Sequence, residues 1–205
     1  MENDSDFIIK TKLAKKSGSQ TFDLTFRTTS ELFSYKKIDE GTQLLVGEME
    51  INEGDNCLDL GCGYGVLGIA MALQATKGKT YLVDRDFIGV EYSNKNIKEN
   101  KIPNATAILS NGFSHLGKLK FDVIASNLPT HIGTLSLHKI ISDIKEHLSE
   151  NGRVYVVTVS ILKPFIKREF MAAFGNYEKL RQGRMHTVSF ATKNPQQLKV
   201  KMEEG

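Results

Sequence analysis

The chain has 205 residues, which is enough for one domain with a full hydrophobic core. Apolar residues make up 40% and charged residues 25% of it, a balance that excludes a disordered chain outside the two ends. The formal net charge of +3 permits a polyanionic partner but does not demand one, because nucleic-acid binding usually brings a stronger basic bias.

The N-terminal segment, residues 1–32, is predicted to form a β-hairpin. Apolar and polar residues alternate over 21–27, which predicts a strand with one buried face, and a second strand is expected over 7–13. Residues 15–20 between them combine lysine, serine and glycine, which is typical of a turn. We expect this hairpin to be an extension that caps the glycine-dense turn described below.

Strands and helices alternate over the rest of the chain. A loop over 31–41 and a short helix over 42–49 come first. Strands are expected over 56–60, 80–83, 105–109, 121–126, 153–160, 177–181 and 185–192, and helices over 66–75, 88–100, 134–148 and from Pro164 onward. Asn151 and Gly152 are expected to end the third of these helices. Apolar strands alternating with helices predict an α/β fold, a parallel sheet with helices on both faces.

The first central strand ends in a glycine-dense turn over residues 59–68. Such a turn brings backbone N–H groups and a helix N-terminus close to a ligand, and ligands of parallel sheets bind at the carboxyl ends of the strands. The G-x-G-x-x-G pattern within it, followed by Asp84, also fits the dinucleotide fingerprint. The turn therefore predicts a nucleoside-bearing ligand, and a nicotinamide-dependent reductase stays an alternative, although no Tyr-x-x-x-Lys pair accompanies it.

Four stretches carry a more specific pattern. They are Phe33-Ser34, Asp39-x-Gly41-Thr42-x-Leu44-Leu45, Asp59-Leu60-Gly61-Cys62-Gly63-Tyr64-Gly65-Val66-Leu67 and Ser126-Asn127-Leu128-Pro129-Thr130-His131-Ile132-Gly133. Taken together they resemble the class I S-adenosylmethionine-dependent methyltransferases, and among these the small-subunit ribosomal RNA guanine-N2 methyltransferases. The resemblance implies a single Rossmann-like domain over 1–205, with a seven-stranded, mostly parallel sheet. Residues 33–192 would be its catalytic core and 193–205 a loose tail.

The resemblance also implies S-adenosyl-L-methionine as the cofactor. Its candidate ligands are Asp59, Gly61, Cys62, Gly63, Gly65, Asp84, Arg85, Asn111, Gly112 and Asn127. Among them, Asp59 and the glycine backbone would hold the methionine part, Asp84 the ribose and Asn111 the adenine amine. The two cysteines lie in no His-rich neighbourhood, so no metal site is expected.

The catalytic candidates are Asn127, Leu128 and Pro129, in the loop after the fourth central strand. An exocyclic amine of a base is a poor nucleophile because its lone pair is delocalised into the ring. Two acceptors, the Asn127 side-chain oxygen and the Leu128 carbonyl, would bind both amine protons and aim the lone pair at the methyl group. Pro129 biases Leu128 towards extended backbone, which fixes that carbonyl. Positioning is then the main catalytic device.

The loop after the fourth central strand departs from the family pattern. The usual motif is Asn-Pro-Pro followed by an aromatic or other bulky residue, whereas Leu128 and Thr130 stand in two of these places. Thr130 cannot stack on a base, so another residue would have to supply a ring. The candidate substrate-binding residues are Phe33, Lys36, Thr130, His131, Lys163 and Arg184.

The sequence therefore predicts an S-adenosylmethionine-dependent N-methyltransferase acting on an exocyclic amine of an RNA base, foremost guanine-N2 of rRNA. Adenine-N6 and the glutamine-N5 of a protein stay open as targets, as does a non-catalytic subunit that only binds cofactor or RNA. The expected partner is rRNA or a ribosomal subunit, and a homo-oligomer is compatible with the sequence. No apolar run is long enough to cross a bilayer, so we expect a cytoplasmic protein without a membrane partner.

Overall fold

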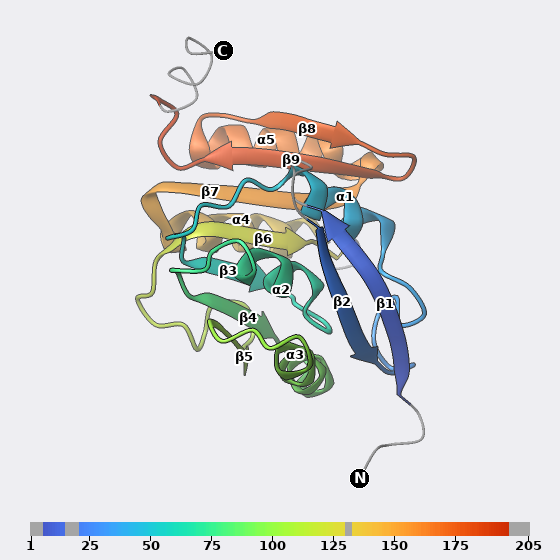
Figure 1. The fold of residues 1–205 in the computed structure, drawn as a ribbon. Coiled ribbons are helices and arrows are strands. Elements are labelled where there is room, and N and C mark those ends of the chain that lie inside the picture. The colour runs from blue at the N-terminus through green and yellow to red at the C-terminus, as the bar shows by residue number, and fades with distance from the viewer. Residues whose placement is uncertain (1–5, 15–20, 130–132, 197–205) are drawn as a thin grey trace.

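The computed structural model describes residues 6–14, 21–129 and 133–196. Its centre is a seven-stranded sheet in the order β5-β4-β3-β6-β7-β9-β8 (Figure 1). The strands are β3 (Cys57–Leu60), β4 (Thr80–Asp84), β5 (Ala105–Leu109), β6 (Phe121–Asn127), β7 (Leu148–Val159), β8 (Glu178–Gln182) and β9 (His186–Thr192). The first five pair in parallel, and β9 runs antiparallel to both β7 and β8. The predicted seven-stranded, mostly parallel sheet is confirmed.

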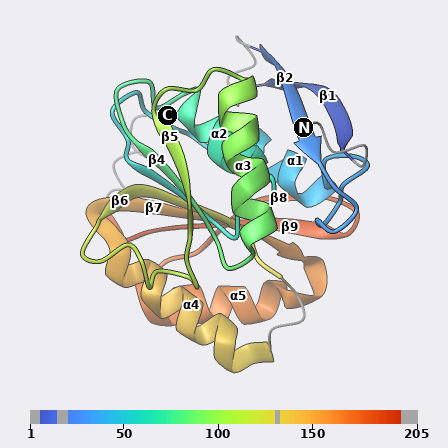
Figure 2. The same cartoon turned by 90° about the horizontal axis from the view of Figure 1, so that it is seen from below.

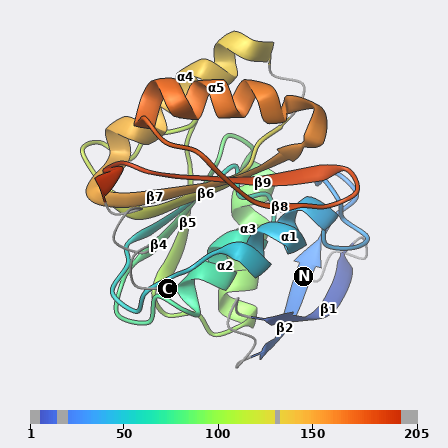
Figure 3. The same cartoon turned by 90° about the horizontal axis from the view of Figure 1, so that it is seen from above.

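Helices cover both faces of the sheet (Figures 2 and 3). One face carries α1 (Glu40–Glu48), α2 (Val66–Ala72) and α3 (Phe87–Glu99), and the other carries α4 (Gly133–His147) and α5 (Lys163–Phe174), which follows the short 3-10 helix η1 (Ser160–Leu162). Two hydrophobic cores result, one under each helical layer. Neighbouring strand residues alternate between them: Cys57 lies in the first core and Leu58 in the second. This is why the central strands β3, β6 and β7 carry apolar residues on both faces.

The predicted boundary between the third of the predicted helices and the strand after it is wrong. Asn151 and Gly152 do not end the helix before β7, because α4 already ends at His147 and Leu148 pairs with Phe121 as the start of β7. Gly152 lies inside β7, where an added Cβ would be 3.0 Å from the Phe121 carbonyl oxygen. The glycine therefore allows a close approach of two strands at a register shift, a use that the sequence does not distinguish from a helix cap.

The N-terminal hairpin consists of β1 (Phe7–Ala14) and β2 (Thr21–Thr28), paired antiparallel as predicted. Buried Asn96 of α3 holds it in place. The Asn96 side chain accepts from the Arg27 N–H at 2.7 Å, and donates to the carbonyls of Arg27 at 2.9 Å and Tyr64 at 2.8 Å. The Tyr64 ring also packs edge-on against Phe26, with centroids 5.9 Å apart. The hairpin is thus attached to the glycine-dense turn, as the sequence predicted.

Candidate active site

Five parallel strands end at one edge of the sheet, which we call the site edge (Figure 1). The glycine turn, residues 61–65, follows β3, and Asp84 is the last residue of β4. Asn111 comes shortly after β5, and Asn127 is the last residue of β6. The residues predicted to contact the cofactor and the substrate amine therefore lie along the same edge, where ligands of parallel sheets bind.

The backbone of the glycine turn is open on one side. Gly61, Gly63 and Gly65 have φ angles of 78°, 53° and 93°, a region that favours glycine. Nothing described lies within 4 Å of the position that a Cβ would take at Gly61 or Gly63. At Gly65 the same position is 2.9 Å from the Oγ of Ser93. The first two glycines thus leave the backbone accessible to a ligand, and the third allows close packing on α3.

Asp59 lies beneath this turn with an unpaired oxygen. The side chain is 1% exposed, and its Oδ2 accepts from the N–H of Gly68 at 2.8 Å. Its Oδ1 is buried and has no hydrogen-bond partner among the described residues. Burial raises the pKa of the Asp59 carboxyl to about 7, the Gly68 N–H lowers it, and the charge of Asp84 raises it further. The site therefore holds a buried acceptor to which no described residue donates.

Asp84 both supports the glycine turn and faces the site edge. Its Oδ2 accepts from the Gly63 N–H at 2.9 Å, and its Oδ1 accepts from the Asp86 N–H at 3.0 Å. Asp86 in turn caps α3 by accepting from the N–H of Ile88 at 2.9 Å. Each carboxylate oxygen of Asp84 keeps further lone pairs for a hydroxyl donor. Asp84 is the last residue of β4, one residue beyond the predicted strand, and so lies at the strand end expected to meet a ribose.

The remaining predicted cofactor residues differ in exposure. Arg85 and Asn111 are exposed at the site edge, and Gly112 has a φ of 59° with nothing described within 4 Å of a Cβ position. Cys62 is buried, and its Sγ lies 3.4 Å from the Ser93 hydroxyl, so its side chain has a packing role. Phe113 stacks on His147 of α4, with centroids 4.2 Å apart. That ring belongs to the core on the α4 side.

Asn127 is held by the start of α1. Its Nδ2 donates to the Oδ2 of Asp39 at 2.9 Å and to the Oγ1 of Thr42 at 3.0 Å. Among the described residues, no donor contacts its Oδ1. The neighbouring Ser126 hydroxyl donates to the carbonyl of Leu60 at 2.7 Å, which joins the ends of β6 and β3. The carboxamide therefore lies beside the glycine turn, and its oxygen has no hydrogen-bond partner among the described residues.

Leu128 is fixed in a way that a proline would not allow. Its N–H donates to the Val157 carbonyl at 3.0 Å, and its side chain is buried in the core under α4. The departure from the family motif thus adds a hydrogen bond and an apolar anchor at the base of the loop. Pro129 follows and is exposed. Thr130 and His131, both predicted to contact the substrate, lie outside the described residues.

The other predicted substrate residues lie on two sides of the site edge. Phe33 is 76% exposed, and Lys36 is exposed, in the loop before α1. The glycine turn contacts this loop, because the Tyr64 hydroxyl donates to the Ser34 carbonyl at 3.4 Å. Lys163 begins α5 on the other face of the sheet, and Arg184 is exposed in the turn between β8 and β9, where Gly183 lies close to Leu44 of α1. The sequence placed all four near the edge, and the described hydrogen bonds of Asn127 go instead to Asp39 and Thr42.

Sequence reasoning missed three polar residues around the start of α1. Asp39 and Thr42 contact its carboxamide directly, although both were quoted only as part of a motif. His186, the first residue of β9, has a buried Nδ1 without a partner among the described residues. A Cβ added at Gly41 would be 2.9 Å from both Asp39 Oδ2 and the His186 ring. The motif spacing Asp39-x-Gly41-Thr42 was the available signal, since it matches a helix N-cap.

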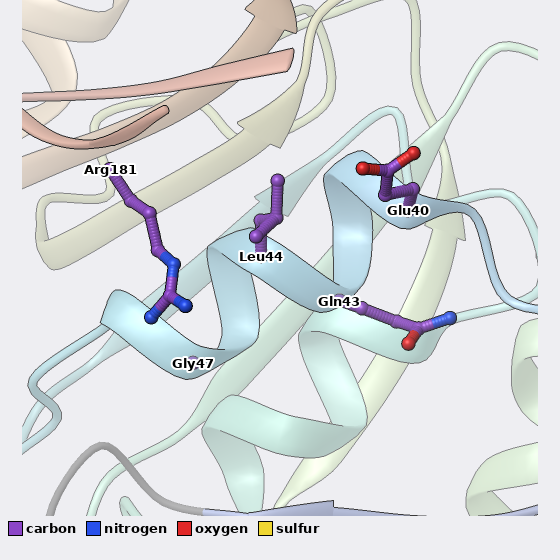
Figure 4. Close-up of a pocket in the computed structure, with 5 residues that line it drawn as sticks. All are labelled: Glu40, Gln43, Leu44, Gly47 and Arg181. Atoms are coloured by element: carbon purple, nitrogen blue, oxygen red, sulfur yellow. The ribbon is translucent and has the colours of Figure 1, made fainter. Parts of the chain in front are cut away.

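A pocket of about 260 Å³ lies elsewhere, on the outer side of α1. Figure 4 shows its lining residues, Glu40, Gln43, Leu44, Gly47 and Arg181. The Arg181 guanidinium pairs with Glu48 at 3.2 Å. None of the lining residues belongs to the glycine turn or to the loop after β6, so we assign this pocket no role in the site.

Two further properties concern the described part of the chain as a whole. Over residues 6–14, 21–129 and 133–196, no group of three or more histidine, cysteine, aspartate or glutamate side chains is arranged to hold a metal ion. No helix in the same ranges combines the length and the apolar character needed to span a membrane.

The fold and this edge define a methyltransferase. The family model of the methyltransferase small domain matches residues 23–189, and the chain belongs to that family. The chain is 32% identical to an uncharacterized protein of Bacillus subtilis (strain 168), YbxB, over 75% of this chain and 81% of that one. It is 33% identical to ribosomal RNA small subunit methyltransferase C of Hamiltonella defensa over 84% of this chain.

The chain spans only part of the relatives with an assigned name. It covers 52% of the Hamiltonella protein, about half of its length. Among solved structures, a 16S rRNA N2 methyltransferase of T. thermophilus in complex with AdoMet and guanosine matches with a TM-score of 0.79. That match covers 94% of this chain and 52% of the other at 24% identity, and it shows that the two share a fold.

Proposed function

We propose that this chain is an S-adenosylmethionine-dependent N-methyltransferase that modifies an exocyclic amine of an RNA base, guanine-N2 of rRNA. The observation that carries the proposal is the placement of Asn127 at the strand end next to the open glycine turn, with a carboxamide oxygen that no described residue contacts as a donor. Membership of the methyltransferase small domain family supports the reaction type. The name of the Hamiltonella relative supports rRNA as the substrate, which agrees with a cytoplasmic location.

The residues of the site edge fit the cofactor. The open positions at Gly61 and Gly63 leave room for a ligand against the backbone. The unpaired Oδ1 of Asp59 and the further lone pairs of Asp84 are acceptors, which suit the ammonium and hydroxyl donors of S-adenosylmethionine. When bound, the cofactor supplies a methyl group on a positively charged sulfur. Exposed Asn111 and Arg85 would then lie beside its adenosine.

The protein's own part in the reaction is to orient the amine. The Asn127 oxygen and the Leu128 carbonyl would accept the two amine protons, which leaves the lone pair directed away from the loop. The Leu128 N–H bond to Val157 and the proline at position 129 both restrict this peptide. No strong base is required, and correct placement of reacting groups is worth up to roughly 7–11 kcal/mol in favourable intramolecular reactions.

RNA would dock on the rim of the site edge. Lys36, Lys163 and Arg184 offer cations for phosphates on both sides of Asn127. Exposed apolar side chains accompany these cations: Ile161 of η1 is 85% exposed, and Phe33, in the same loop as Lys36, is 76% exposed. Met185, whose carbonyl accepts from the Ser160 N–H at 2.8 Å, is exposed beside Arg184. Apolar and basic side chains mixed in this way suit single-stranded bases and their backbone.

The test is methyl transfer from labelled S-adenosylmethionine to four substrates: small ribosomal subunits, free rRNA, DNA and protein. We expect label in rRNA that migrates as N2-methylguanosine, and no label with Asn127→Ala. Label in adenine-N6 or in a protein glutamine would overturn the target while keeping the reaction. Cofactor binding without transfer to any of the four would favour a non-catalytic subunit, and tight binding of NADH instead of S-adenosylmethionine would refute the whole proposal.

A further inference from the structure

We propose that Asp39 and Thr42 are positioning residues that fix which way the Asn127 carboxamide faces. The inference rests on the proposed function, since it concerns the amide expected to bind the substrate amine. Its basis is a pair of contacts: Nδ2 of Asn127 lies 2.9 Å from Asp39 Oδ2 and 3.0 Å from Thr42 Oγ1. Both hydrogens of the Asn127 NH₂ group therefore have an acceptor at the start of α1.

The two contacts determine the orientation of the amide. A carboxylate only accepts hydrogen bonds, so the amide nitrogen, and not the amide oxygen, must face Asp39. The same Asp39 oxygen already accepts from the backbone N–H of Thr42 at 3.0 Å, as the N-cap of α1. Rotating the amide by half a turn would place two oxygens about 2.9 Å apart with no hydrogen between them. The Asn127 oxygen is consequently directed away from α1.

This orientation is the one that amine binding needs. A substrate amine presents N–H donors, and the Asn127 oxygen can accept one of them. The opposite orientation would present the NH₂ group of Asn127 to another amine, and two donors facing each other cannot form a hydrogen bond. Asp39 and Thr42 would thus act on the reaction through Asn127, without touching the substrate themselves.

The start of α1 is built around this arrangement. Asp39 and Thr42 are three residues apart, the spacing of an N-cap and the N–H that it binds. Gly41 lies between them, and any side chain there would collide with the Asp39 carboxylate, because a Cβ would lie 2.9 Å from its Oδ2. Thr42 is itself buried. This short motif therefore caps a helix and presents two acceptors to Asn127, which lies 88 positions after Asp39 and 85 positions after Thr42 in the sequence.

The first test compares Thr42→Val with Thr42→Ser. Both variants keep the backbone N–H that Asp39 caps, but only serine keeps the hydroxyl acceptor for Asn127. We expect Thr42→Val to lower kcat at least threefold with an unchanged KM for S-adenosylmethionine, and Thr42→Ser to restore it. A variant that only loosened the fold would instead lower the melting temperature and the active fraction. Equal kcat values for Thr42→Val and Thr42→Ser would refute the role of Thr42.

The second test separates the negative charge of Asp39 from the acceptor oxygen that it presents to Asn127 and to the Thr42 N–H. Asparagine caps a helix as well as aspartate, and its oxygen can occupy the place of Oδ2. We therefore expect Asp39→Asn to keep kcat within about threefold of the wild type, whereas Asp39→Ala combined with Thr42→Val should lower kcat at least tenfold, since small displacements at a reacting group are costly. Full activity in the double variant would overturn the proposal.

A measurement without turnover keeps this proposal distinct from the proposed function. In nitrogen-15 NMR spectra, the side-chain NH₂ of Asn127, assigned with Asn127→Ala, should show slowly exchanging, hydrogen-bonded protons. The signal should lose this protection in the double variant and keep it in Thr42→Ser. If the wild type transfers no methyl group but the NH₂ is protected, the proposed function fails and the orientation stands. An unprotected NH₂ in the wild type would refute the orientation.

Discussion

Replacing Asp59 with asparagine should remove a strong pH dependence of the folding stability. Asp59 is 1% exposed, and burial raises the pKa of its carboxyl from 3.8 to about 7. A carboxyl whose pKa is higher in the folded than in the unfolded protein favours folding only while it is protonated. Its contribution is therefore fully present below about pH 4 and is lost as the pH rises toward about 7.

The magnitude follows from the two pKa values. At about 1.4 kcal/mol per pKa unit, the difference between 3.8 and about 7 corresponds to about 4 kcal/mol of unfolding free energy. Asparagine keeps an oxygen that can accept from the Gly68 N–H, which lies 2.8 Å from the carboxylate in the native protein. The variant therefore loses the titration and keeps the hydrogen bond. Its stability relative to the wild type should increase by about 4 kcal/mol between about pH 4 and pH 8.

Urea unfolding followed by circular dichroism measures this difference across the pH range. Asp143→Asn, on the outer side of α4 in an ion pair with Lys139, controls for the loss of one carboxylate. Curves for the wild type and Asp59→Asn that stay parallel at every pH would refute the account of Asp59. A cationic ligand near Asp59 should favour its ionised form, so the shift in melting temperature caused by S-adenosylmethionine should rise with pH in the wild type and stay constant in Asp59→Asn.

Three further substitutions test separate parts of the structure. Gly61→Ala should weaken S-adenosylmethionine binding at least tenfold in calorimetry, because the added methyl group would enter the open side of the glycine turn. At a φ of 78°, the alanine should also lower the free energy of unfolding by about 1 kcal/mol. Unchanged affinity would contradict the placement of the cofactor. Gly41→Ala should lower kcat more than cofactor affinity, since its Cβ would displace the Asp39 carboxylate, and a kinetic assay with equal kcat would contradict this. Asn96→Ala removes three hydrogen bonds that join the hairpin to the glycine turn, and it should lower the free energy of unfolding by about 3 kcal/mol in urea. A decrease of less than about 1 kcal/mol would show that the hairpin is held mainly by apolar packing.

Much of the fold could be predicted because the central strands β3, β6 and β7 are largely buried on both faces. Their apolar residues favoured a parallel sheet between two helical layers, and β5 begins and ends as predicted, at Ala105 and Leu109. Local patterns were less informative where one residue type serves two purposes. Gly152 is typical of a helix end, and only the pairing of Leu148 with Phe121 shows that it lies inside a strand.

The candidate site could be predicted where its geometry is local. The glycine turn and Asp84 follow strand ends, and the sequence places strand ends well. The contacts of Asp39 and Thr42 with Asn127 could not be predicted, because they depend on how α1 packs against the end of β6. For the same reason the sequence did not show that one carboxylate oxygen of Asp59 has no hydrogen-bond partner among the described residues.

The most direct test of the central claim is mass spectrometry of rRNA nucleosides from cells that lack the gene. If the chain methylates guanine-N2 of rRNA, one N2-methylguanosine should disappear, return when the wild-type gene is restored, and stay absent when the restored gene carries Asn127→Ala. An unchanged set of methylated rRNA nucleosides in the cells without the gene would contradict the claim, as would full restoration by Asn127→Ala.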